Sequence, residues 1–344
     1  MNIKKIDYWC NKILPTIYVN NNMNELVKNW LDLHYNDFLN HIFVTPQMYG
    51  AVADGVTDDS NAFQKAFDSG YNVVIPFDRN QQYFIGKTLN ITTARQLISG
   101  MCKGRPSEST GTQPYTRGGI IFKNSLEIGF NVTANSVTIE NINFTNSKRE
   151  SAHYVTAINA DYLNHRDTDL TVKNCSFFVM KTCVYHIGRG LTFKDNLCIA
   201  CDVCVSQTIA GEPTKGFNSD KYGNRACTIH NNRFHAIAFE SILLTGNNIQ
   251  SCLISDNTMD VGRGFLRVEG TVLSMIISNN IIHFPRQYSI YIHNISKNIV
   301  ISGNSFMGSN NSDINVNTYD FIRFYNECSN IVINGNSFTD CVKS

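Results

Sequence analysis

Six polar or aromatic residues recur in pairs at matching positions of three successive segments, namely Arg267 and Glu269, Tyr291 and His293, and Arg323 and Tyr325. One position separates the members of each pair, so in a strand both side chains point to the same face. Aromatic rings can pack on sugar faces, arginine binds acidic groups, and a glutamate beside a histidine can transfer protons. We therefore predict a binding face made by Arg267, Tyr291, Arg323 and Tyr325, with Glu269 and His293 as candidate catalytic residues. The alternative is an ordinary solvated sheet.

Parallel stacking of these segments would align their side chains in two outward ladders. We expect one ladder to contain Asp161, Ser206, Thr245, Glu269, His293 and Tyr325, and the adjacent one Asn159, His186, Arg267, Tyr291 and Arg323. Glycosidic hydrolysis normally needs two carboxyl groups about 5 Å apart for retention or about 6.5 to 9.5 Å apart for inversion. Glu240 and Asp320 lie five residues before their ladder positions, which we expect to be too far. The sequence therefore does not show catalysis, and a lyase or a carboxylate pair formed between subunits stays open.

The chain has 11 cysteines, of which Cys198, Cys201 and Cys204 follow a Cys-x2-Cys-x2-Cys spacing that also occurs in metal and redox sites. In the repeat described next, Cys198 falls at a core position, whereas Cys204 is expected on the outer face of a strand. Thiols that point in different directions cannot hold one ion. We therefore predict reduced, mostly buried thiols that pack as small hydrophobic groups, with no metal site and no cofactor.

The elements that must position these residues form a repeat of three strand-like residues, a polar residue, a turn residue, usually Asn, any residue and a large apolar one. Its copies are residues 137–144, 170–177, 191–198, 227–234, 252–259, 275–282, 299–306 and 331–338. The sixth position holds Asn196, Asn232, Asn257, Asn280, Asn304 and Asn336, with Ile142 and Cys175 in the first two copies. Alternation with period two and variable spacing between copies indicate stacked β-coils. The repeat predicts an all-β parallel β-helix, in which each Asn tolerates left-handed backbone angles at the bend and bonds its neighbour one coil away.

A different pattern precedes the repeat. It combines a glycine-containing turn with Asp54, Asp58 and Asp59 and continues into a short amphipathic helix over residues 58–68 with Phe63 and Phe67 on one face. We expect Asp58 or Thr57 to cap the helix, the three carboxylates to be structural, and the helix to close the open apolar end of the coils. Residues 45–344 are therefore predicted to form the β-helix domain. Residues 1–44 are predicted to form a short helical segment that attaches or oligomerises, or else one more capping helix.

One outward ladder of the first strands changes from threonine to apolar residues along the stack. It begins with Thr138, Thr171, Thr192 and Thr228 and ends with Leu253, Ile276, Val300 and Val332. Strands that are hydrophobic on both faces require cover by another layer. We therefore predict a subunit interface at Leu253, Ile276, Val300 and Val332, with cover by the chain's own residues as the alternative.

Composition excludes several classes of function. The formal net charge is +1 and only 17% of the residues are charged, which argues against a dedicated nucleic-acid binder. Apolar runs are too short for a membrane span, and the first residues lack the core of a secretory signal, so we expect synthesis in a cytoplasm. The 43 asparagines are best explained by the turns of the repeat.

The motif of residues 48–67, followed by the strand segments at 73–76 and 83–86, resembles the N-terminal motif of the pectate-lyase-like right-handed β-helix superfamily, which includes phage tailspikes. Residues 7–15 are similar to the opening of appendage proteins of short-tailed phages of Gram-positive hosts. The resemblance implies a virion tail appendage made in the host cytoplasm, a homotrimer, and contacts with other tail proteins through the N-terminal segment. It implies binding of a bacterial surface glycan, either teichoic acid or capsular polysaccharide. A depolymerase of that glycan and a purely structural tail component are the alternatives.

Overall fold

The computed structural model describes residues 43–77, 81–101, 119–147, 154–161, 169–208, 224–246, 249–308 and 320–339. The predicted segment 1–44 lies outside these residues except for Phe43 and Val44. Within the described residues, no helix is both long enough and apolar enough to cross a membrane.

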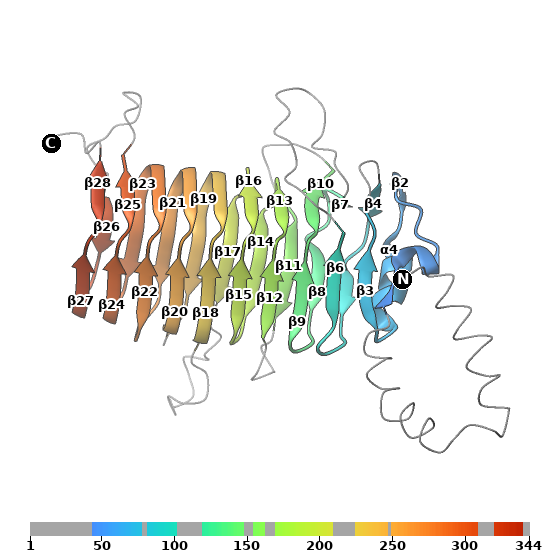
Figure 1. Cartoon of the computed structure of the whole chain (residues 1–344), viewed down its shortest axis with the longest axis horizontal. Helices are drawn as coiled ribbons and strands as arrows, with labels where there is room; N and C mark the ends of the chain where they lie inside the picture. Colours follow the sequence, from blue (N-terminus) through green and yellow to red (C-terminus); the bar gives the residue numbers. More distant parts are fainter. Residues whose placement is uncertain are drawn as a thin grey trace, which may run out of the picture. The chain divides into compact units, whose positions relative to one another are not determined.

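The β-helix domain consists of parallel strands that stack coil upon coil (Figure 1). One sheet contains β1 (Phe43–Val44), β3 (Asn72–Ile75), β6 (Leu97–Gly100), β9 (Val137–Glu140), β12 (Leu170–Lys173), β15 (Leu191–Lys194), β18 (Asn224–His230), β20 (Ile249–Ser255), β22 (Met275–Ser278), β24 (Ser296–Ser302) and β27 (Cys328–Asn334).

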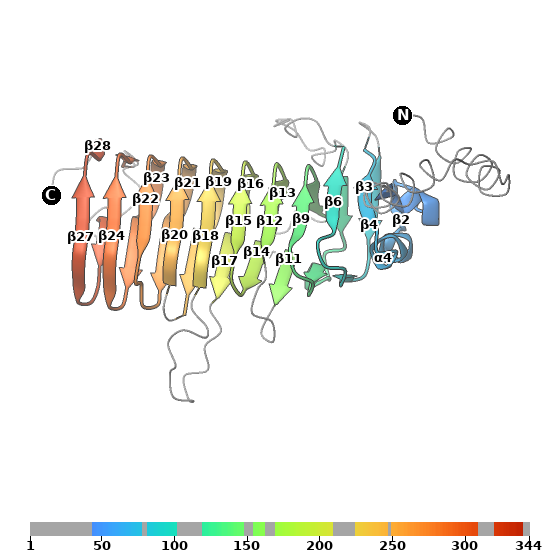
Figure 2. The ribbon, with the colours of Figure 1, turned by 60° about the horizontal axis from the view of Figure 1, so that its bottom comes forward.

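The second sheet contains the remaining strands and lines the rest of each coil. They are β2 (Asp54–Asp58), β4 (Gln82–Ile85), β5 (Leu89–Ile91), β7 (Gly119–Phe122), β8 (Ile128–Val132), β10 (Asn143–Asn146), β11 (Thr156–Asp161), β13 (Ser176–Phe178), β14 (Thr182–Ile187), β16 (Leu197–Ile199), β17 (Val203–Thr208), β19 (Arg233–Thr245), β21 (Thr258–Glu269), β23 (Ile281–His293), β25 (Ser305–Met307), β26 (Asp320–Phe324) and β28 (Ser337–Thr339). In the turned view the strands of the first sheet lie in front of those of the second (Figure 2). The predicted parallel β-helix is confirmed.

The core runs along the inside of the coils, because the inward position of each repeat carries an apolar side chain. Phe122 stacks on Phe144 with ring centroids 5.8 Å apart, and Phe144 stacks on Phe177 at 5.1 Å. All three rings are fully buried. Such stacks contribute to stability beyond their buried area, so these rings help to hold three successive coils together.

The asparagines at the sixth position form a continuous buried ladder at the bend, as predicted. The side-chain amide of each donates to the side-chain oxygen of the next, at 3.1 Å from Asn196 to Asn232 and 2.9 Å from Asn232 to Asn257. The same oxygens also accept the backbone N–H of the coil before. The prediction of left-handed angles was wrong by one position, because the residue with positive φ is the preceding one, such as Asp195 or Asn231. The ladder asparagine is free to point inward because its neighbour makes the turn.

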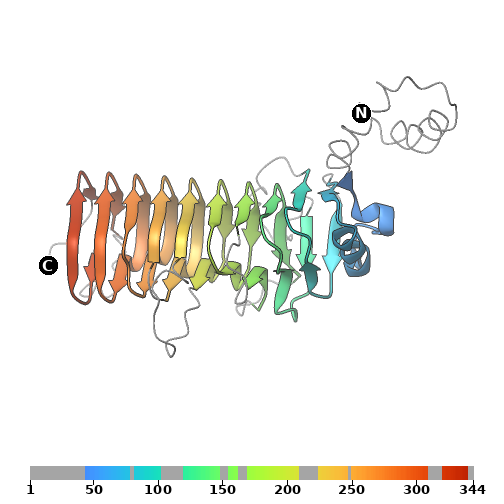
Figure 3. The same ribbon diagram turned by 90° about the horizontal axis from the view of Figure 1, so that it is seen from below.

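The helix α4 (Ser60–Asp68) packs at the first coils, as Figure 3 shows. Phe63, Ala66 and Phe67 are buried in the same core as the coils, and the Phe63 ring lies 5.0 Å from that of Tyr83. The helix begins at Ser60 rather than at residue 58. The predicted capping role for this element is therefore supported by its packing.

The three acidic residues before α4 have structural partners, as expected. The Asp54 carboxylate accepts the backbone N–H groups of Val56 and Thr57 at 2.8 and 2.7 Å. Asp58 accepts the backbone N–H of Ser60 at 3.0 Å, at the start of the helix. Asp59 turns back and accepts Val52 N–H at 2.7 Å and Ala53 N–H at 3.1 Å. These carboxylates hold a turn, so we assign them no chemistry.

Candidate functional site

One line of outward side chains crosses the second sheet from coil to coil, and we call it the outer ladder. Its members are paired in register between successive strands, and they are Asn131, Asn159, Tyr185, Ser206, Leu243, Arg267, Tyr291 and Arg323. Eight coils at about 4.8 Å per step give a line of about 34 Å. The outer ladder is therefore long enough to run beside an extended polymer.

The six residues singled out in the sequence come together at the C-terminal end of this line. Arg267, Tyr291 and Arg323 are successive members of the outer ladder. Glu269 pairs with His293 in the neighbouring ladder, and the His293 ring stacks on Tyr325 at 4.7 Å.

Two expected ladder members lie elsewhere. Ser206 belongs to the outer ladder rather than to the Glu269 ladder, which contains Thr208 at that coil. His186 is fully buried, and Tyr185 takes its expected place beside Asn159. The register predicted for the strands of these two coils was wrong. These strands carry apolar residues on both faces, so the alternation of polar and apolar residues does not show which side chains point outward.

A second glutamate reaches the site, contrary to the sequence-based expectation for Glu240. The Arg267 guanidinium forms ion pairs with Glu269, through Nη2, and with Glu240, through Nη1 at 3.5 Å. The pairing of β19 with β21 shifts register between Ile237 and Glu240, and that of β21 with β23 shifts between Gly262 and Gly264. Both shifts lie before Glu240 and Gly264, so Glu240 does stand five residues before Thr245, and it joins the site because the long Arg267 side chain reaches it.

Tyr288 completes this cluster from two coils away. Glu240, Gly264 and Tyr288 are paired in register in successive strands, and the Tyr288 hydroxyl donates to the Glu240 carboxylate at 2.6 Å. A Cβ at position 264 would lie 2.3 Å from the Tyr288 ring. The ring therefore reaches across this coil only because residue 264 is glycine, and a glycine inside a strand was the sequence signal for this close approach.

Electrostatics keep two members of the cluster, Tyr288 and Arg267, protonated. Burial and the hydrogen bond to Glu240 raise the pKa of Tyr288, so its phenol stays protonated and cannot serve as a base near neutral pH. Burial opposes the charge on Arg267, but its pairing with Glu269 prevails and its pKa is raised. The guanidinium thus remains a permanent cation that bridges two carboxylates.

The aromatic rings at this end surround the arginines. The Arg267 and Arg323 guanidinium carbons lie 5.8 and 5.9 Å from the centre of the Tyr291 ring. Arg323 also pairs with Asp320, Nε to carboxylate oxygen at 3.6 Å. Both arginines are therefore already matched by carboxylates, which leaves little uncompensated positive charge for an acidic ligand.

A groove adjoins this cluster along the same ladder. It encloses about 850 Å³ and is lined by residues of β8, β11, β14, β17 and β19 and the turns next to them. Four of its lining residues are members of the outer ladder, Asn159, Tyr185, Ser206 and Leu243, and its charged residues are Glu127 and Lys181. The groove and the Arg267 cluster together make one surface with hydroxyl, amide and aromatic groups, which suits an uncharged or weakly charged sugar polymer.

The chemistry open to the cluster follows from its two carboxylates. One guanidinium contacts both, and its two Nη atoms are about 2.3 Å apart, so the contacting oxygens of Glu240 and Glu269 are separated by about 8 Å at most. This upper limit on the distance between the two carboxylates is compatible with the separations used in glycosidic hydrolysis. Glu240 is only 5% exposed, whereas Glu269 lies at the surface, so Glu269 is the member that a substrate would meet first.

The predicted interface residues form a second surface on the other sheet, which we call the apolar ladder. Leu253, Ile276, Val300 and Val332 pair in register in four successive strands. Ile276 and Val332 are 47% and 46% exposed. The ladder is as the sequence predicted, and it leaves apolar side chains uncovered within the described part of the chain.

No protein-family model matches the chain. It is 37% identical over 84 residues to the pre-neck appendage protein of Bacillus phage phi29, and the match covers 21% of this chain and 10% of that protein. It is 40% identical over 42 residues, 12% of this chain and 6% of the other, to a capsule K30/K69-specific depolymerase of Klebsiella phage K64-1. The chain thus spans about a tenth or less of the length of these relatives.

Two solved tailspikes have the same fold. The Dettilon tailspike has a TM-score of 0.56 at 15% identity, with 86% of this chain and 62% of that chain covered. The phiAB6 tailspike, solved in complex with oligosaccharides of Acinetobacter baumannii surface polysaccharide, has a TM-score of 0.54 at 16% identity, with 88% and 49% covered. These similarities confirm the β-helix fold, and the appendage match agrees with the resemblance seen in the sequence.

Proposed function

We propose that this protein attaches the phage tail to a bacterial cell by binding a surface glycan along the outer ladder. The observation that carries the proposal is the continuity of this surface, because the groove at Tyr185 and Ser206 leads directly to the rings of Tyr291 and Tyr325. A stack of regularly spaced polar and aromatic side chains matches a polymer with a repeating unit.

The ligand class follows from the charges on the surface. Arg267 and Arg323 are each paired with carboxylates, so the site is better suited to hydroxyl-rich sugars than to a densely charged polymer. Of the two glycans implied by the sequence, capsular polysaccharide therefore fits better than teichoic acid.

The assembly remains part of the proposal. A homotrimer in the tail would cover the apolar ladder, residues 1–44 would contact other tail proteins, and the chain would be synthesised in the host cytoplasm.

Binding can be tested with purified chain and three probes, namely Gram-positive cell walls, wall teichoic acid and capsular polysaccharide. We expect Tyr291→Ala to weaken binding at least tenfold, because it removes the ring between two arginines. Thr192→Ala, on the opposite sheet, is the matched control and should bind as the wild type does. Equal binding by both variants, or adsorption of the wild type to none of the probes, would contradict the proposal and favour a purely structural role.

A second candidate function is cleavage of the same glycan, and it is favoured by the two carboxylates that meet at Arg267. Glu269 would act as the exposed carboxylate, with Glu240 as its buried partner and His293 beside it. We expect Glu269→Gln to reduce the release of new reducing ends at least 100-fold while binding is kept. Release of neither reducing ends nor unsaturated sugars by the wild type would refute the depolymerase and leave the binding proposal standing.

A further inference from the structure

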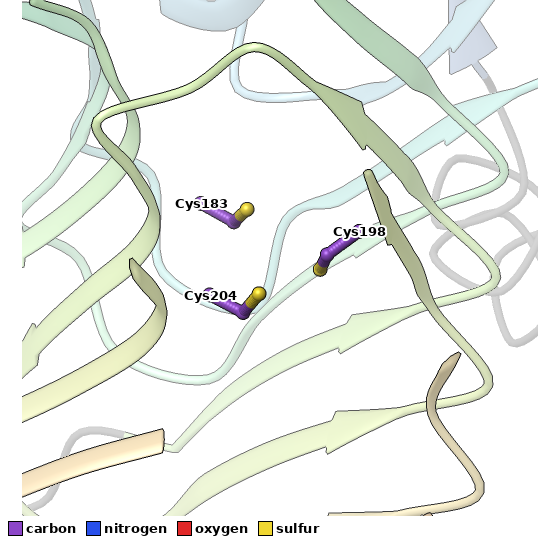
Figure 4. A group of neighbouring side chains, drawn as sticks. All are labelled: Cys183, Cys198 and Cys204. Carbon is purple, nitrogen blue, oxygen red and sulfur yellow. The ribbon is translucent and has the colours of Figure 1, made fainter. Parts of the chain in front are cut away.

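Three cysteine thiols meet inside the coils, and two of them come from the strands that carry Tyr185 and Ser206 of the outer ladder. The sulfur atoms of Cys183, Cys198 and Cys204 all lie within 4.8 Å of one another, and all three residues are fully buried (Figure 4). They come from β14, β16 and β17. Sequence reasoning placed Cys204 on the outer face, and this was wrong, because Cys204 points into the core.

The topology explains why the thiols converge. The pairings of Thr182 with Val203 and of Val184 with Val205 place Cys183 and Cys204 side by side in adjacent coils. Cys198 approaches from the strand that lines another side of the same coil, as Figure 4 shows. A fourth thiol of the same core, Cys201, is buried as well and donates to the backbone carbonyls of Phe177 and Ile199 at 3.6 and 3.3 Å. The spacing that resembled a metal motif thus gains its missing ligand from the preceding coil rather than from the motif itself.

We propose that this three-cysteine cluster is a buried binding site for a thiophilic d10 cation. The donor set contains only sulfur, which selects Cu⁺ or Zn²⁺ over hard cations such as Mg²⁺ and Ca²⁺. Three sulfurs around an ion at about 2.3 Å are about 4 Å apart, so shifts of less than about 1 Å bring the thiols into contact with one ion. Cu⁺ would be held by Cys183, Cys198 and Cys204, and Zn²⁺ would recruit Cys201 as a fourth ligand.

Binding exchanges thiol protons for the cation. Each thiol that ionises releases one proton to solvent, and the ion cancels one of the resulting negative charges if it is Cu⁺ and two if it is Zn²⁺. Since all the sulfurs are inaccessible in the folded chain, the ion must enter during folding. The site would then tie together three strands at the middle of the stack and stabilise the folded state.

The test uses the full chain expressed with Zn²⁺, Cd²⁺ or Cu⁺ in the medium and purified without chelator. We expect one equivalent of ion per chain by native mass spectrometry, with sulfur-to-metal charge-transfer absorption in the Cd²⁺ and Cu⁺ forms. In Cys198→Ala the amount of bound ion per chain should fall at least tenfold. The control is Cys252→Ala, which removes a buried thiol that pairs with Cys227 in another part of the core and should retain it.

The Cys201→Ala variant distinguishes the ions. If the wild type binds Zn²⁺ preferentially and Cys201→Ala abolishes this binding, the site has four ligands. If the wild type binds Cu⁺ and Cys201→Ala leaves this binding intact, the site has three. A wild-type chain that carries no stoichiometric ion under any of these conditions, or a folded Cys198→Ala chain that loads as the wild type does, would overturn the proposal. If Cys198→Ala does not fold, the wild type and Cys252→Ala still decide the question, since both must carry the ion and show the absorption.

Discussion

Replacement of Asn257 by alanine should remove the centre of the asparagine ladder. The side chain is fully buried and makes four hydrogen bonds. Its oxygen accepts the backbone N–H and the side-chain amide of Asn232, at 3.0 and 2.9 Å. Its amide donates to the Ile229 carbonyl at 2.9 Å and to the Asn280 side-chain oxygen at 3.0 Å.

The magnitude follows from the groups left without partners. Alanine leaves the Asn232 N–H without an acceptor, one amide hydrogen of Asn232 unpaired and the Ile229 carbonyl without this donor, while the Asn280 oxygen still accepts the backbone N–H of residue 257. Each buried orphan costs about 1–3 kcal/mol. Two or three of them, partly relieved by a water that enters the vacated volume, give an expected loss of about 3–5 kcal/mol.

The assay is urea unfolding at fixed protein concentration, followed by circular dichroism, with Asn330→Ala as the matched control. Asn330 also bonds an asparagine in the preceding coil, Asn298, but both are exposed, so loss of this bond should cost less than about 1 kcal/mol. Because Asn330 has a φ of 55°, alanine adds about 1 kcal/mol of backbone strain, and the total for the control stays below the loss expected for Asn257→Ala. Unfolding rates replace midpoints if refolding is incomplete. A loss for Asn257→Ala no larger than that for Asn330→Ala would refute the reasoning, because the ladder would then contribute no more than exposed pairs do.

Three further perturbations test other parts of the molecule. Gly264→Ala should displace the Tyr288 ring from Glu240, reduce glycan binding or cleavage several-fold and lower the free energy of unfolding by about 1–3 kcal/mol. Gly262→Ala is the milder control, because its Cβ would meet the flexible Met259 thioether at 3.2 Å. Identical behaviour of the two variants would contradict the close approach of Tyr288 to residue 264. Burial opposes ionisation of Asp58, but hydrogen bonds from Ser60 and Gly86 prevail and lower its pKa below 3.8, so its ionised form stabilises the fold at neutral pH and this contribution is lost as the pH falls through that lowered pKa. Acid titration of thermal stability should therefore show a smaller loss between about pH 5 and pH 2 for Asp58→Asn than for the wild type, and parallel curves would argue against a role for this carboxylate. Ile276→Asp should reduce self-association, measured by sedimentation velocity, without loss of β-structure. Thr192→Asp, in the polar half of the same line of residues, should leave self-association unchanged. An Ile276→Asp oligomer of unchanged size would argue against an interface on the apolar ladder.

The short pattern of the repeat was sufficient to predict the fold, because its information is local and periodic. An apolar residue at every second position, an asparagine at the sixth position and a turn residue before it define one coil, and stacking of like coils is the arrangement that buries all their apolar faces. The same logic placed Leu253 and Ile276 in one exposed line and placed Arg267 beside Tyr291.

Tertiary structure alone decided which groups meet where the regular pattern breaks. The long Arg267 side chain reaches a buried carboxylate, Glu240, of the neighbouring coil, and a missing Cβ at Gly264 lets Tyr288 span a coil. The Cys183, Cys198 and Cys204 thiols converge because three strands face one interior, which no spacing along a single coil expresses. A sequence states the period of a solenoid directly, whereas contacts across the core and at bulges depend on the relative heights and rotations of different strands, which are set only when the coils pack.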